Sequence, residues 1–390
     1  MAVPKIKSSL RHRNLRFYAS CGAIAALFLL VSSSGRVSST VHSFRSTIQD
    51  ATNSTLGFEK IIVMGMPERH DKRDALTLAA SLSDLEFEWE AGVDGSAIVE
   101  KAKPPIMDKE LTLSNKTLGC WRAHMNALQR VVKENIQTAL IMEDDVDWDV
   151  NIKQLALNLA HGTKYIEGSE NRATRSPYGD DWELLWLGHC GMMKKPEPLA
   201  RYYITDNDPT VVPPSHFHFP KRPLLDQPPL SANFTRLVFK PELGICAYAY
   251  AVTLEGARRL LHQETQSFTS ASAADFALRR FCRVYKNWGT AANCIGAWPS
   301  LFTSYRAPGP TGKDSDRTTY AGPAWRDVGM SSHTVFSTRL NFEALLKPRG
   351  GSQRVIKSQW PDETLLREYT GELKLPQGRG IELVGHERLP

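Results

Sequence analysis

The stretch Thr138–Asp149, TALIMEDDVDWD, changes from apolar to acidic within a few residues. Its first half has the short, bounded apolar run of a strand that is buried on both faces, as in a parallel sheet. Five carboxylates follow at once: Glu143, Asp144, Asp145, Asp147 and Asp149. Because the ligands of open α/β sheets bind beyond the carboxyl ends of the strands, this junction is the first place to expect a ligand site.

Strand and helix patterns alternate around this stretch. Lys60–Gly65, KIIVMG, has the apolar run of a central strand, and a helix is expected from Pro67 onward because proline favours the first helical turn. A second strand is expected within Glu86–Gly95, and Thr117–Asn135 has the apolar spacing of an amphipathic helix. This order is doubly wound, so the sequence predicts an α/β fold with a mostly parallel central sheet flanked by helices.

The second half of the chain shows the same kinds of pattern around one long irregular segment. A strand is expected within Asp181–Gly191, and Gly244–Leu261 is expected to form a strand followed by a helix. Between them, Pro209–Pro229 is rich in proline and aromatic residues and has no period. A loop of this length is more often functional than ordinary, so we expect it to shape access to a site.

The two ends of the chain differ from its middle. Residues 1–16 are basic, 17–34 contain the uncharged apolar run FYASCGAIAALFLLV, and 35–58 are rich in Ser and Thr. A basic flank before a short apolar run predicts a signal anchor or a cleaved signal peptide, and the long basic flank favours the anchor. We therefore expect a cytosolic tail, a membrane anchor and a flexible stem, then a folded domain over 59–308 and an irregular C-terminal extension over 309–390.

This arrangement predicts a type II membrane protein of the Golgi apparatus or endoplasmic reticulum with its folded domain in the lumen, or a secreted protein if the apolar run is cleaved. Three N-x-S/T triplets agree with a lumenal address and begin at Asn53, Asn115 and Asn233. The five cysteines beyond the apolar run lack CxxC spacing, so zinc is not expected, and their odd number leaves at least one unpaired: Cys120, Cys190, Cys246, Cys282 and Cys294.

Composition excludes other classes of protein. The chain has 390 residues, of which 42% are hydrophobic and 23% charged, enough to bury a sizeable core. Its net charge is +6, but the basic residues are spread out and are not interleaved with aromatic residues in a stripe. We therefore expect no nucleic-acid partner.

The acidic cluster has two readings. Three consecutive carboxylates, Glu143, Asp144 and Asp145, repel one another unless a cation or partner neutralises them, and a hard ion such as Mn²⁺ or Mg²⁺ prefers oxygen ligands. Such ions are commonly held by one or two carboxylates and a substrate's phosphates, which indicates a diphosphate ligand. The alternative is a solvated acidic turn that opens the next helix. Asp147 and Asp149 fit that alternative and are expected at the surface.

Taken together, the motifs resemble glycosyltransferase family 25, which contains the lipopolysaccharide-type β-galactosyltransferases and the collagen galactosyltransferases. The matching blocks occur in the family's order between about Lys60 and Tyr305: IIVMGMPERHDKR, EAGVDG, LTLSNKTLGCWRAHMNAL, ALIMEDDV, LLWLG, GICAYAYAVTLEGARRLL and AADFAL. The resemblance implies a GT-A-like fold, a nucleotide-sugar donor and inversion at the transferred sugar. It places the family's acidic metal motif on Glu143, Asp144 and Asp145.

The resemblance also implies roles for other residues. Arg69 and Arg73 fall where the family has basic residues near the nucleotide, and Asp94 and Gly95 match the DG pair near the base or ribose. Gly119, Cys120 and His124 match a family helix, but Ala123 stands where the family usually has Ser, which leaves the role of that helix open. Asp275 matches the family's late acidic position and is the candidate general base, which an inverting transferase needs to deprotonate the acceptor hydroxyl.

The implied reaction is a metal-assisted single displacement in which a hexose, with galactose from UDP-galactose as the first candidate, passes to a hydroxyl of a glycan or glycoprotein. Two alternatives remain at this stage. One is an inactive lumenal relative that binds carbohydrate, and the other is a secreted glycoside hydrolase that uses Asp144 and Asp275 as a carboxylate pair.

Overall fold

A computed structural model describes residues 46–104, 113–193, 199–217, 229–266, 274–283, 291–316 and 324–384. The predicted cytosolic tail, 1–16, and anchor, 17–34, lie outside these ranges, as does most of the proline-rich segment, at 218–228. Within the described ranges, no helix has the length and apolar character needed to cross a membrane.

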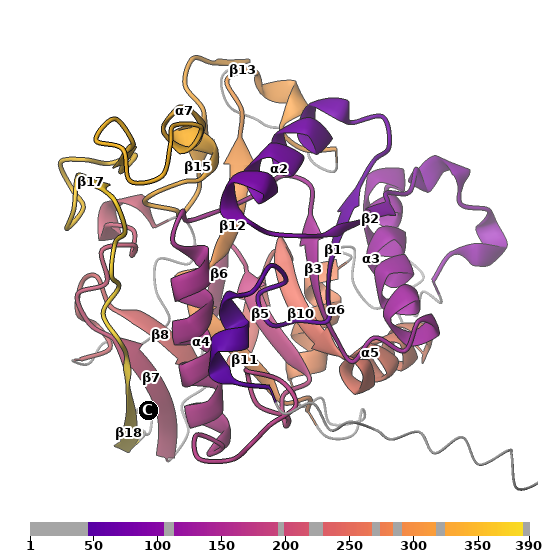
Figure 1. Cartoon of the computed structure of the whole chain (residues 1–390). Helices are drawn as coiled ribbons and strands as arrows, with labels where there is room; N and C mark the ends of the chain where they lie inside the picture. The colour runs from indigo at the N-terminus through magenta and orange to yellow at the C-terminus, as the bar shows by residue number, and fades with distance from the viewer. Residues whose placement is uncertain are drawn as a thin grey trace, which may run out of the picture. The chain divides into compact units, whose positions relative to one another are not determined.

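A nine-stranded sheet forms the centre of the unit that begins at Arg45 (Figure 1). Its strands, in order across the sheet, are β18 (Arg379–Val384), β7 (Leu199–Thr205), β8 (Arg236–Phe239), β11 (Cys294–Trp298), β5 (Leu184–Gly188), β10 (Ala249–Thr253), β3 (Thr138–Glu143), β1 (Lys60–Gly65) and β2 (Glu88–Ala91). The pairings make β2, β1, β3, β5, β11 and β7 run one way, and β10, β8 and β18 the other. The predicted α/β fold, with helices flanking a sheet whose strands mostly share one direction, is confirmed.

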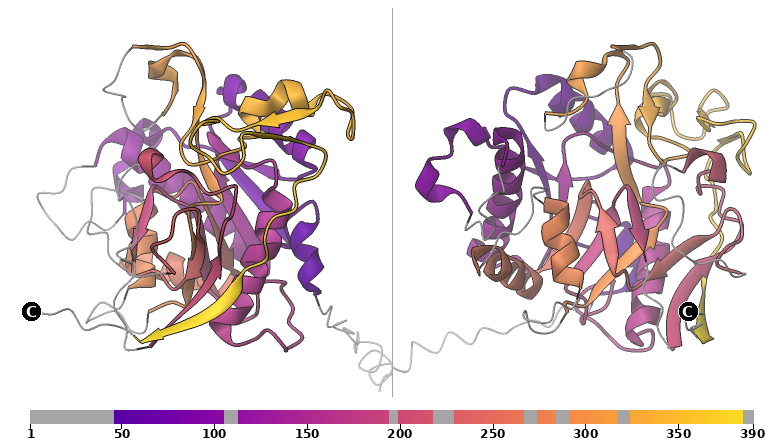
Figure 2. Two further views of the ribbon diagram at one scale, coloured as in Figure 1. Left: turned by 90° about the vertical axis from the view of Figure 1, so that its left-hand side faces the viewer. Right: turned by 180° about the vertical axis from the view of Figure 1, so that it is seen from behind.

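Helices cover both faces of this sheet because successive side chains of a strand point to opposite faces. In β1, Ile61 and Val63 join a core with α2 (His70–Ser83) and α4 (Ile152–Glu167). Ile62 and Met64 join a second core with α3 (Asn115–Lys133), α5 (Leu254–Gln266) and α6 (Ala274–Cys282). Figure 2 shows α5 and α6, in coral, across the sheet from α4.

The order of β3, β1 and β2 creates a switch point. The chain crosses from β1 through α2 to β2 on one side, and then returns through α3 past β1 to β3. The two crossovers leave in opposite directions, so the helices α2 and α3 separate beyond the carboxyl ends of β1 and β3. Open α/β sheets bind ligands in the crevice that such a switch point creates.

Smaller sheets surround the central one. They are β15 (Met330–Ser331) with β12 (Phe302–Arg306) and β4 (Val146–Trp148); β13 (Gly309–Pro310) with β14 (Trp325–Arg326); β16 (Val355–Lys357) with β17 (Glu368–Thr370); and β6 (Gly191–Met193) with β9 (Leu243–Ile245). The remaining helices are α7 (Phe342–Leu345) and the 3-10 helices η1 (Ile48–Thr52), η2 (Gly95–Ala97), η3 (Glu100–Ala102), η4 (Pro214–His216), η5 (Thr311–Lys313) and η6 (Arg339–Asn341).

The predicted surface position of Asp147 and Asp149 is wrong. Both carboxylates are buried and bind the C-terminal part of the chain. Asp147 accepts hydrogen bonds from the Ser337 hydroxyl and the Arg339 backbone, and Asp149 accepts one from the backbone N–H of Phe336 at 3.1 Å. A buried carboxylate must be hydrogen-bonded, and here the partners come from a segment too distant in sequence for a local pattern to reveal.

Two predicted boundaries are corrected by the same packing. Residues 309–316 and 324–384 are no irregular extension, since β18 completes the central sheet against β7 and the side chains of Val335 and Phe336 are fully buried. The predicted flexible stem, 35–58, is folded from Ser46 onward: η1 lies there, and Phe58 stacks on Tyr178 with ring centroids 4.8 Å apart. Apolar residues were too sparse in both segments to show a period.

Candidate active site

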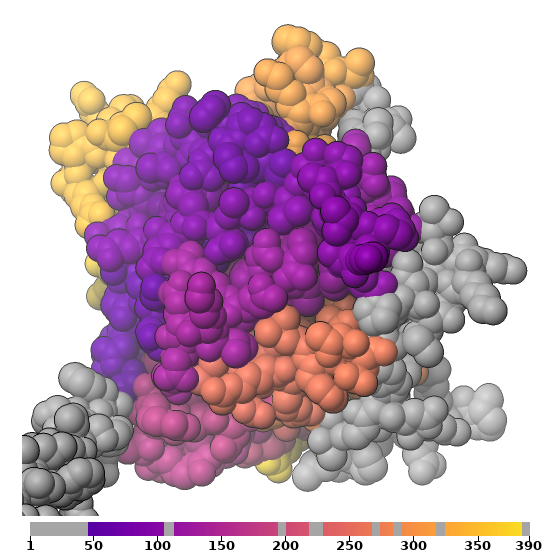
Figure 3. Space-filling view, turned by 90° about the vertical axis from the view of Figure 1, so that its right-hand side faces the viewer, coloured from indigo at the N-terminus to yellow at the C-terminus, as the bar shows by residue number. Residues whose placement is uncertain are grey.

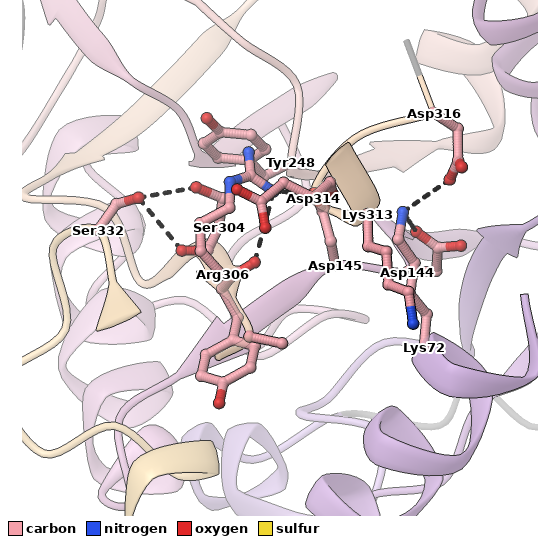
Figure 4. A network of polar contacts seen from close by, with 12 residues as sticks. Lys72, Asp144, Asp145, Tyr248, Ser304, Arg306, Lys313, Asp314, Asp316 and Ser332 are labelled. Carbon is pink, nitrogen blue, oxygen red and sulfur yellow. Dashed lines mark hydrogen bonds and ion pairs between the residues drawn. The ribbon is translucent and has the colours of Figure 1, made fainter. Parts of the chain in front are cut away.

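A cavity of about 390 Å³ opens at the carboxyl ends of β1 and β3, at the switch point of the sheet. One wall carries the first turns of α3, and another carries Gly65 and the N-terminal turn of α2. The acidic triplet Glu143–Asp145 lines it, as do Arg306 and Asp316 from the C-terminal third of the chain. Figure 4 shows how Lys72 and Arg306 approach the acidic residues from different elements.

Asp144 is neutralised by a lysine that the sequence prediction did not include. The Lys72 Nζ lies 3.0 Å from Asp144 Oδ1 and 2.8 Å from Asp316 Oδ2, and Lys72 and Asp144 are both buried (Figure 4). Burial raises the pKa of Asp144 to about 6, opposed by Lys72 and reinforced by the charge on Asp145. The loop that carries Asp316 is thereby tied to α2 across the mouth of the cavity.

Asp145 has a different cationic partner. Its Oδ2 accepts a hydrogen bond from Arg306 Nη1 at 2.5 Å, and its backbone oxygen accepts one from Tyr305. Its other carboxylate oxygen, Oδ1, is buried and has no hydrogen-bond partner among the described residues. A buried carboxylate oxygen without a partner is costly, so Oδ1 is suited to receive a cation or a donor from a ligand.

Glu143 turns toward α3 and away from its two neighbours in sequence. Its Oε1 lies 3.6 Å from His124 Nε2, and Cys120 completes a group whose ligand atoms all lie within 4.8 Å of one another. Within the described ranges, this is the one group of three His, Cys, Asp or Glu side chains that close together. The three carboxylates of the triplet therefore have three different partners: His124, Lys72 and Arg306.

The predicted nucleotide-binding residues divide into two sets. Arg69, Asp94 and Gly95 line the cavity. Arg69 pairs with Asp71 at 2.9 Å and also with Asp316, while the Asp94 carboxylate accepts a hydrogen bond from Ser96 N. Arg73 is absent from the cavity wall, because its guanidinium lies 3.9 Å from the centroid of the Trp89 ring.

Gly95 and Gly119 bring the loop after β2 against α3. A Cβ on Gly95 would lie 1.8 Å from the backbone oxygen of Asn115, and one on Gly119 would lie 2.2 Å from that of Val93. Only glycine allows this approach of two backbones. One close contact thus explains the glycines of both motifs, Asp94-Gly95 and Gly119-Cys120. This contact fixes the position of α3 at the cavity wall.

The candidate general base, Asp275, lies in the first turn of α6 and outside the residues that line this cavity. It is buried, and its Oδ2 accepts a hydrogen bond from Cys246 N at 3.1 Å. Cys246 itself lines the cavity, with a positive φ of 67°. Asp275 and Asp144 therefore do not share the cavity wall, as the hydrolase alternative would require.

Disulfides fix the wall around Cys246. Cys190 bonds to Cys246 and Cys282 bonds to Cys294, while Cys120 is free. The prediction that at least one downstream cysteine is unpaired is confirmed. The three glycosylation-triplet asparagines, Asn53, Asn115 and Asn233, are all exposed.

Sequence reasoning missed Lys72, Arg306 and Asp316. Lys72 had a usable signal, because it lies three residues after Arg69 within the helix predicted from Pro67 onward, and residues at that spacing on a helix share a face. Arg306 and Asp316 had none, because no local pattern indicates that a segment about 160 residues beyond β3 returns to it. Figure 3 shows another such return, where the coral surface of the α5 and α6 region adjoins the purple surface of α3.

Comparison with known proteins agrees with this site. Residues 58–175, which include β1, α2, α3 and the acidic triplet, match the model of glycosyltransferase family 25 (LPS biosynthesis protein). The procollagen galactosyltransferases 2 of Mus musculus and Homo sapiens are each 23% identical over 155 residues, which cover 36% of this chain and 23% and 22% of theirs. Procollagen galactosyltransferase 1-B of Xenopus laevis is 19% identical over 230 residues, 56% of this chain and 30% of its own.

The chain thus spans less than a third of the length of these relatives. The matched segment is nevertheless the one that builds most of the cavity wall, from Gly65 at the end of β1 to Asp145. The resemblance that the motifs predicted is confirmed, since residues 58–175 match the model of glycosyltransferase family 25.

Proposed function

We propose that this protein is a metal-dependent inverting glycosyltransferase that moves a hexose from a nucleotide sugar to a hydroxyl of a glycan or glycoprotein. The donor proposed first is UDP-galactose, because the relatives are named procollagen galactosyltransferases. The observation that supports this most is the cavity at the β1–β3 switch point, where buried carboxylates and cations meet inside the segment that matches the family.

Lys72 and Arg69 are the proposed diphosphate ligands. Both lie at the N-terminal end of α2, line the cavity, and hold the Asp316 carboxylate in this structure. A diphosphate presents the same kind of anionic oxygen, and the guanidinium of Arg69 suits phosphate geometry. The donor would replace Asp316 on these two cations. Asp94 and Gly95, on the adjoining wall, are the proposed contacts for the ribose or base.

The proposed cation site consists of Glu143, Asp144 and Asp145. The unpartnered Oδ1 of Asp145 and the buried carboxyl of Asp144 fit a hard cation, Mn²⁺ or Mg²⁺, that prefers oxygen ligands. Glu143 contributes less in this arrangement, since it faces His124. When bound, such a cation supplies positive charge against the leaving diphosphate. Arg306, which already holds Asp145, keeps that carboxylate aimed at the cavity.

Asp275 is kept as the proposed base for the acceptor hydroxyl, and its contact with Cys246 gives a way to test it. If Asp275 removes the proton, Asp275→Asn lowers turnover and leaves donor binding intact. If it only holds the Cys246 backbone, the same variant weakens donor binding and turnover together, because Cys246 belongs to the cavity wall.

We also propose a lumenal location in the Golgi apparatus or endoplasmic reticulum, with the chain anchored as a type II membrane protein, or secreted if the apolar run is cleaved. The exposure of Asn53, Asn115 and Asn233 supports access to the glycosylation machinery. Carbonate extraction and glycosidase treatment of the full chain expressed in cells test both points. Release by carbonate would contradict anchoring, and unchanged mobility after glycosidase would contradict lumenal delivery.

The activity test is release of UDP from a panel of UDP-sugars by the purified chain, with and without Mn²⁺ and in the presence of a chelator. We expect metal-dependent release, fastest with UDP-galactose, and we expect Asp145→Asn to abolish it. Failure of every sugar nucleotide to release UDP would overturn the transferase proposal, and an unaffected Asp145→Asn variant would overturn the cation assignment.

One observation favours a second candidate, a carbohydrate-binding relative without turnover. Lys72 and Arg306 already neutralise Asp144 and Asp145, so the carboxylates are stable together without a metal ion. Calorimetry with UDP and Mn²⁺ separates the two candidates. The non-catalytic protein would bind sugar ligands but show neither metal-dependent UDP affinity nor UDP release.

A further inference from the structure

Cys120, His124 and Glu143 converge on one point of the cavity wall. All three line the cavity, and their ligand atoms lie within 4.8 Å of one another. Cys120 and His124 are one turn apart on α3, and therefore share a face of that helix. Glu143 ends β3, which packs beside α3. The group is thus built from a helix and a strand that the fold holds rigidly together.

The spacing of these atoms fits coordination of one ion. Tetrahedral Zn²⁺ holds nitrogen, oxygen and sulfur ligands at about 2.0 to 2.3 Å, which places neighbouring ligand atoms about 3.3 to 3.6 Å apart. His124 Nε2 and Glu143 Oε1 lie 3.6 Å apart. Cys120 supplies a thiol that neither disulfide uses.

The histidine is also oriented as a metal ligand would be. Its Nδ1 lies 3.0 Å from the hydroxyl of Tyr250, a fully buried residue of β10, and the two rings are stacked at 5.6 Å. In the tautomer in which Nδ1 donates to the Tyr250 hydroxyl, the lone pair is on Nε2, the atom that faces Glu143. Metal-binding histidines are typically fixed in this way by a partner on the other ring nitrogen.

We infer that Cys120, His124 and Glu143 form a binding site for a borderline-soft divalent cation of the Zn²⁺ or Co²⁺ type, with a fourth position open to the cavity. A sulfur, nitrogen and oxygen ligand set selects such ions over Mn²⁺ and Mg²⁺. The site shares Glu143 with the proposed oxygen site, whose other ligands are Asp144 and Asp145, and differs from it in its sulfur and nitrogen ligands. Binding replaces the S–H bond of Cys120 by a sulfur–metal bond and releases the proton to solvent.

Cobalt titration of the purified full-length chain tests this inference without any nucleotide, so the result does not depend on the proposed transferase activity. All variants carry Cys21→Ser, which removes the other cysteine outside the two disulfides. Co²⁺ bound to a thiolate gives a sulfur-to-metal charge-transfer band in the near ultraviolet. We expect that band to saturate at one ion per chain and to disappear when Zn²⁺ displaces the cobalt.

Variants assign the ligands. Cys120→Ser should abolish the band, Glu143→Gln should weaken cobalt binding, and Asp145→Asn should leave the band unchanged. Tyr250→Phe should keep the band but reduce affinity by about 10-fold to 100-fold, as expected for loss of an orienting partner. Circular dichroism confirms that each variant is folded. The absence of the band in the folded Cys21→Ser protein, or its persistence in Cys120→Ser, would overturn the site.

Discussion

Lys72 is the residue on which the charge balance of the cavity depends. It is buried and joins Asp144 of the acidic triplet to Asp316 of the distant loop. Removing one partner of a buried ion pair leaves an uncompensated charge, which costs about 3 kcal/mol or more. We expect Lys72→Met to lower the free energy of unfolding by about that amount, measured by urea denaturation, and to weaken UDP binding at least tenfold in calorimetry.

Lys153 offers a matched control for that change. Its ammonium lies 2.8 Å from Asp84, a largely exposed carboxylate, and surface pairs contribute little. Lys153→Met should change the free energy of unfolding by less than about 0.5 kcal/mol and leave UDP binding intact. Equal effects of the two substitutions would mean that the buried pair has no special role.

Asp149 predicts a pH dependence of stability. Burial raises its pKa to about 7, opposed by hydrogen bonds from Asn151 and Phe336. The folded state therefore binds this proton more tightly than the unfolded chain, so the stability that the neutral carboxyl contributes is full below about pH 4 and is lost as pH rises to about 7. Asp149→Asn cannot ionise. Its unfolding free energy relative to the wild type should rise by about 2 to 3 kcal/mol between pH 5 and pH 8.

Denaturation series at several pH values measure this difference, with Asp84→Asn as the exposed control. Parallel curves for Asp149→Asn and the wild type would show that Asp149 does not titrate in this range.

The sequence placed the Glu143–Asp145 triplet at the cavity, but it could not show that Asp149 is buried, because the residues that cover it lie far along the chain.

Among the secondary-structure elements, α3 has the least room to move, because its backbone contacts the loop after β2. Replacing a glycine in the middle of a helix by alanine normally raises the free energy of unfolding by about 1 kcal/mol. Gly119 should behave in the opposite way, because its Cβ would lie 2.2 Å from the backbone oxygen of Val93. We expect Gly119→Ala to destabilise the protein and to weaken UDP binding, since α3 must move away from the loop that carries Asp94.

Gly312→Ala is the control, because a Cβ there meets nothing within 4 Å. Thermal melts and UDP calorimetry of the two variants should differ clearly. If Gly119→Ala matched Gly312→Ala in both measurements, the close approach of α3 to the loop would not limit the site.

The elements that the sequence predicted best are those with a strong local pattern. β1 has the predicted bounds, Lys60–Gly65, because its apolar run ends sharply at a glycine. α2 begins at His70, three residues after Pro67, since Arg69 takes the cap position with a non-helical backbone. The strands β11 (Cys294–Trp298) and β12 (Phe302–Arg306) belong to different sheets, which no single-strand pattern reveals because pairing partners are set by tertiary packing.

For the whole molecule, the two disulfides should contribute unequally. Cys190–Cys246 closes a loop with a sequence separation of 56, whereas Cys282–Cys294 spans 12. Loop entropy gives stabilisations of about 4 and 3 kcal/mol, respectively. We expect Cys190→Ser/Cys246→Ser to melt at the lower temperature and to weaken UDP binding, because Cys246 lines the cavity.

Cys282→Ser/Cys294→Ser should lower the melting temperature less and leave UDP affinity nearly unchanged, because neither cysteine lines the cavity. Calorimetry measures the melting temperatures of the two double variants and so gives their order. The reverse order of melting temperatures would contradict the ranking by loop entropy, and equal loss of UDP affinity would contradict a special role of Cys246 in the cavity wall.

The general architecture could be read from the first half of the chain, where each strand is followed by a helix of clear period. The part after residue 308 could not, because residues 309–316 and 324–384 add short strands and buried polar contacts to surfaces formed much earlier in the chain. The cavity reflects this division. Its Asp144 and Lys72 come from the patterned half, while Arg306 and Asp316 come from the part without a period.

The buried carboxylates of Asp147 and Asp149 impose an order on biosynthesis. Ser337, which binds Asp147, is made 190 residues later. At about 5 to 20 residues per second, a ribosome needs about 10 to 40 s to reach it. Throughout that interval Asp147 and the neighbouring Asp149 have only their local hydrogen bonds from Trp148 and Asn151, and water must solvate the oxygen atoms that Ser337 and Phe336 later bind. This edge of the nascent domain therefore stays open until the segment with Ser337 has been made, and chaperones have that time to bind it.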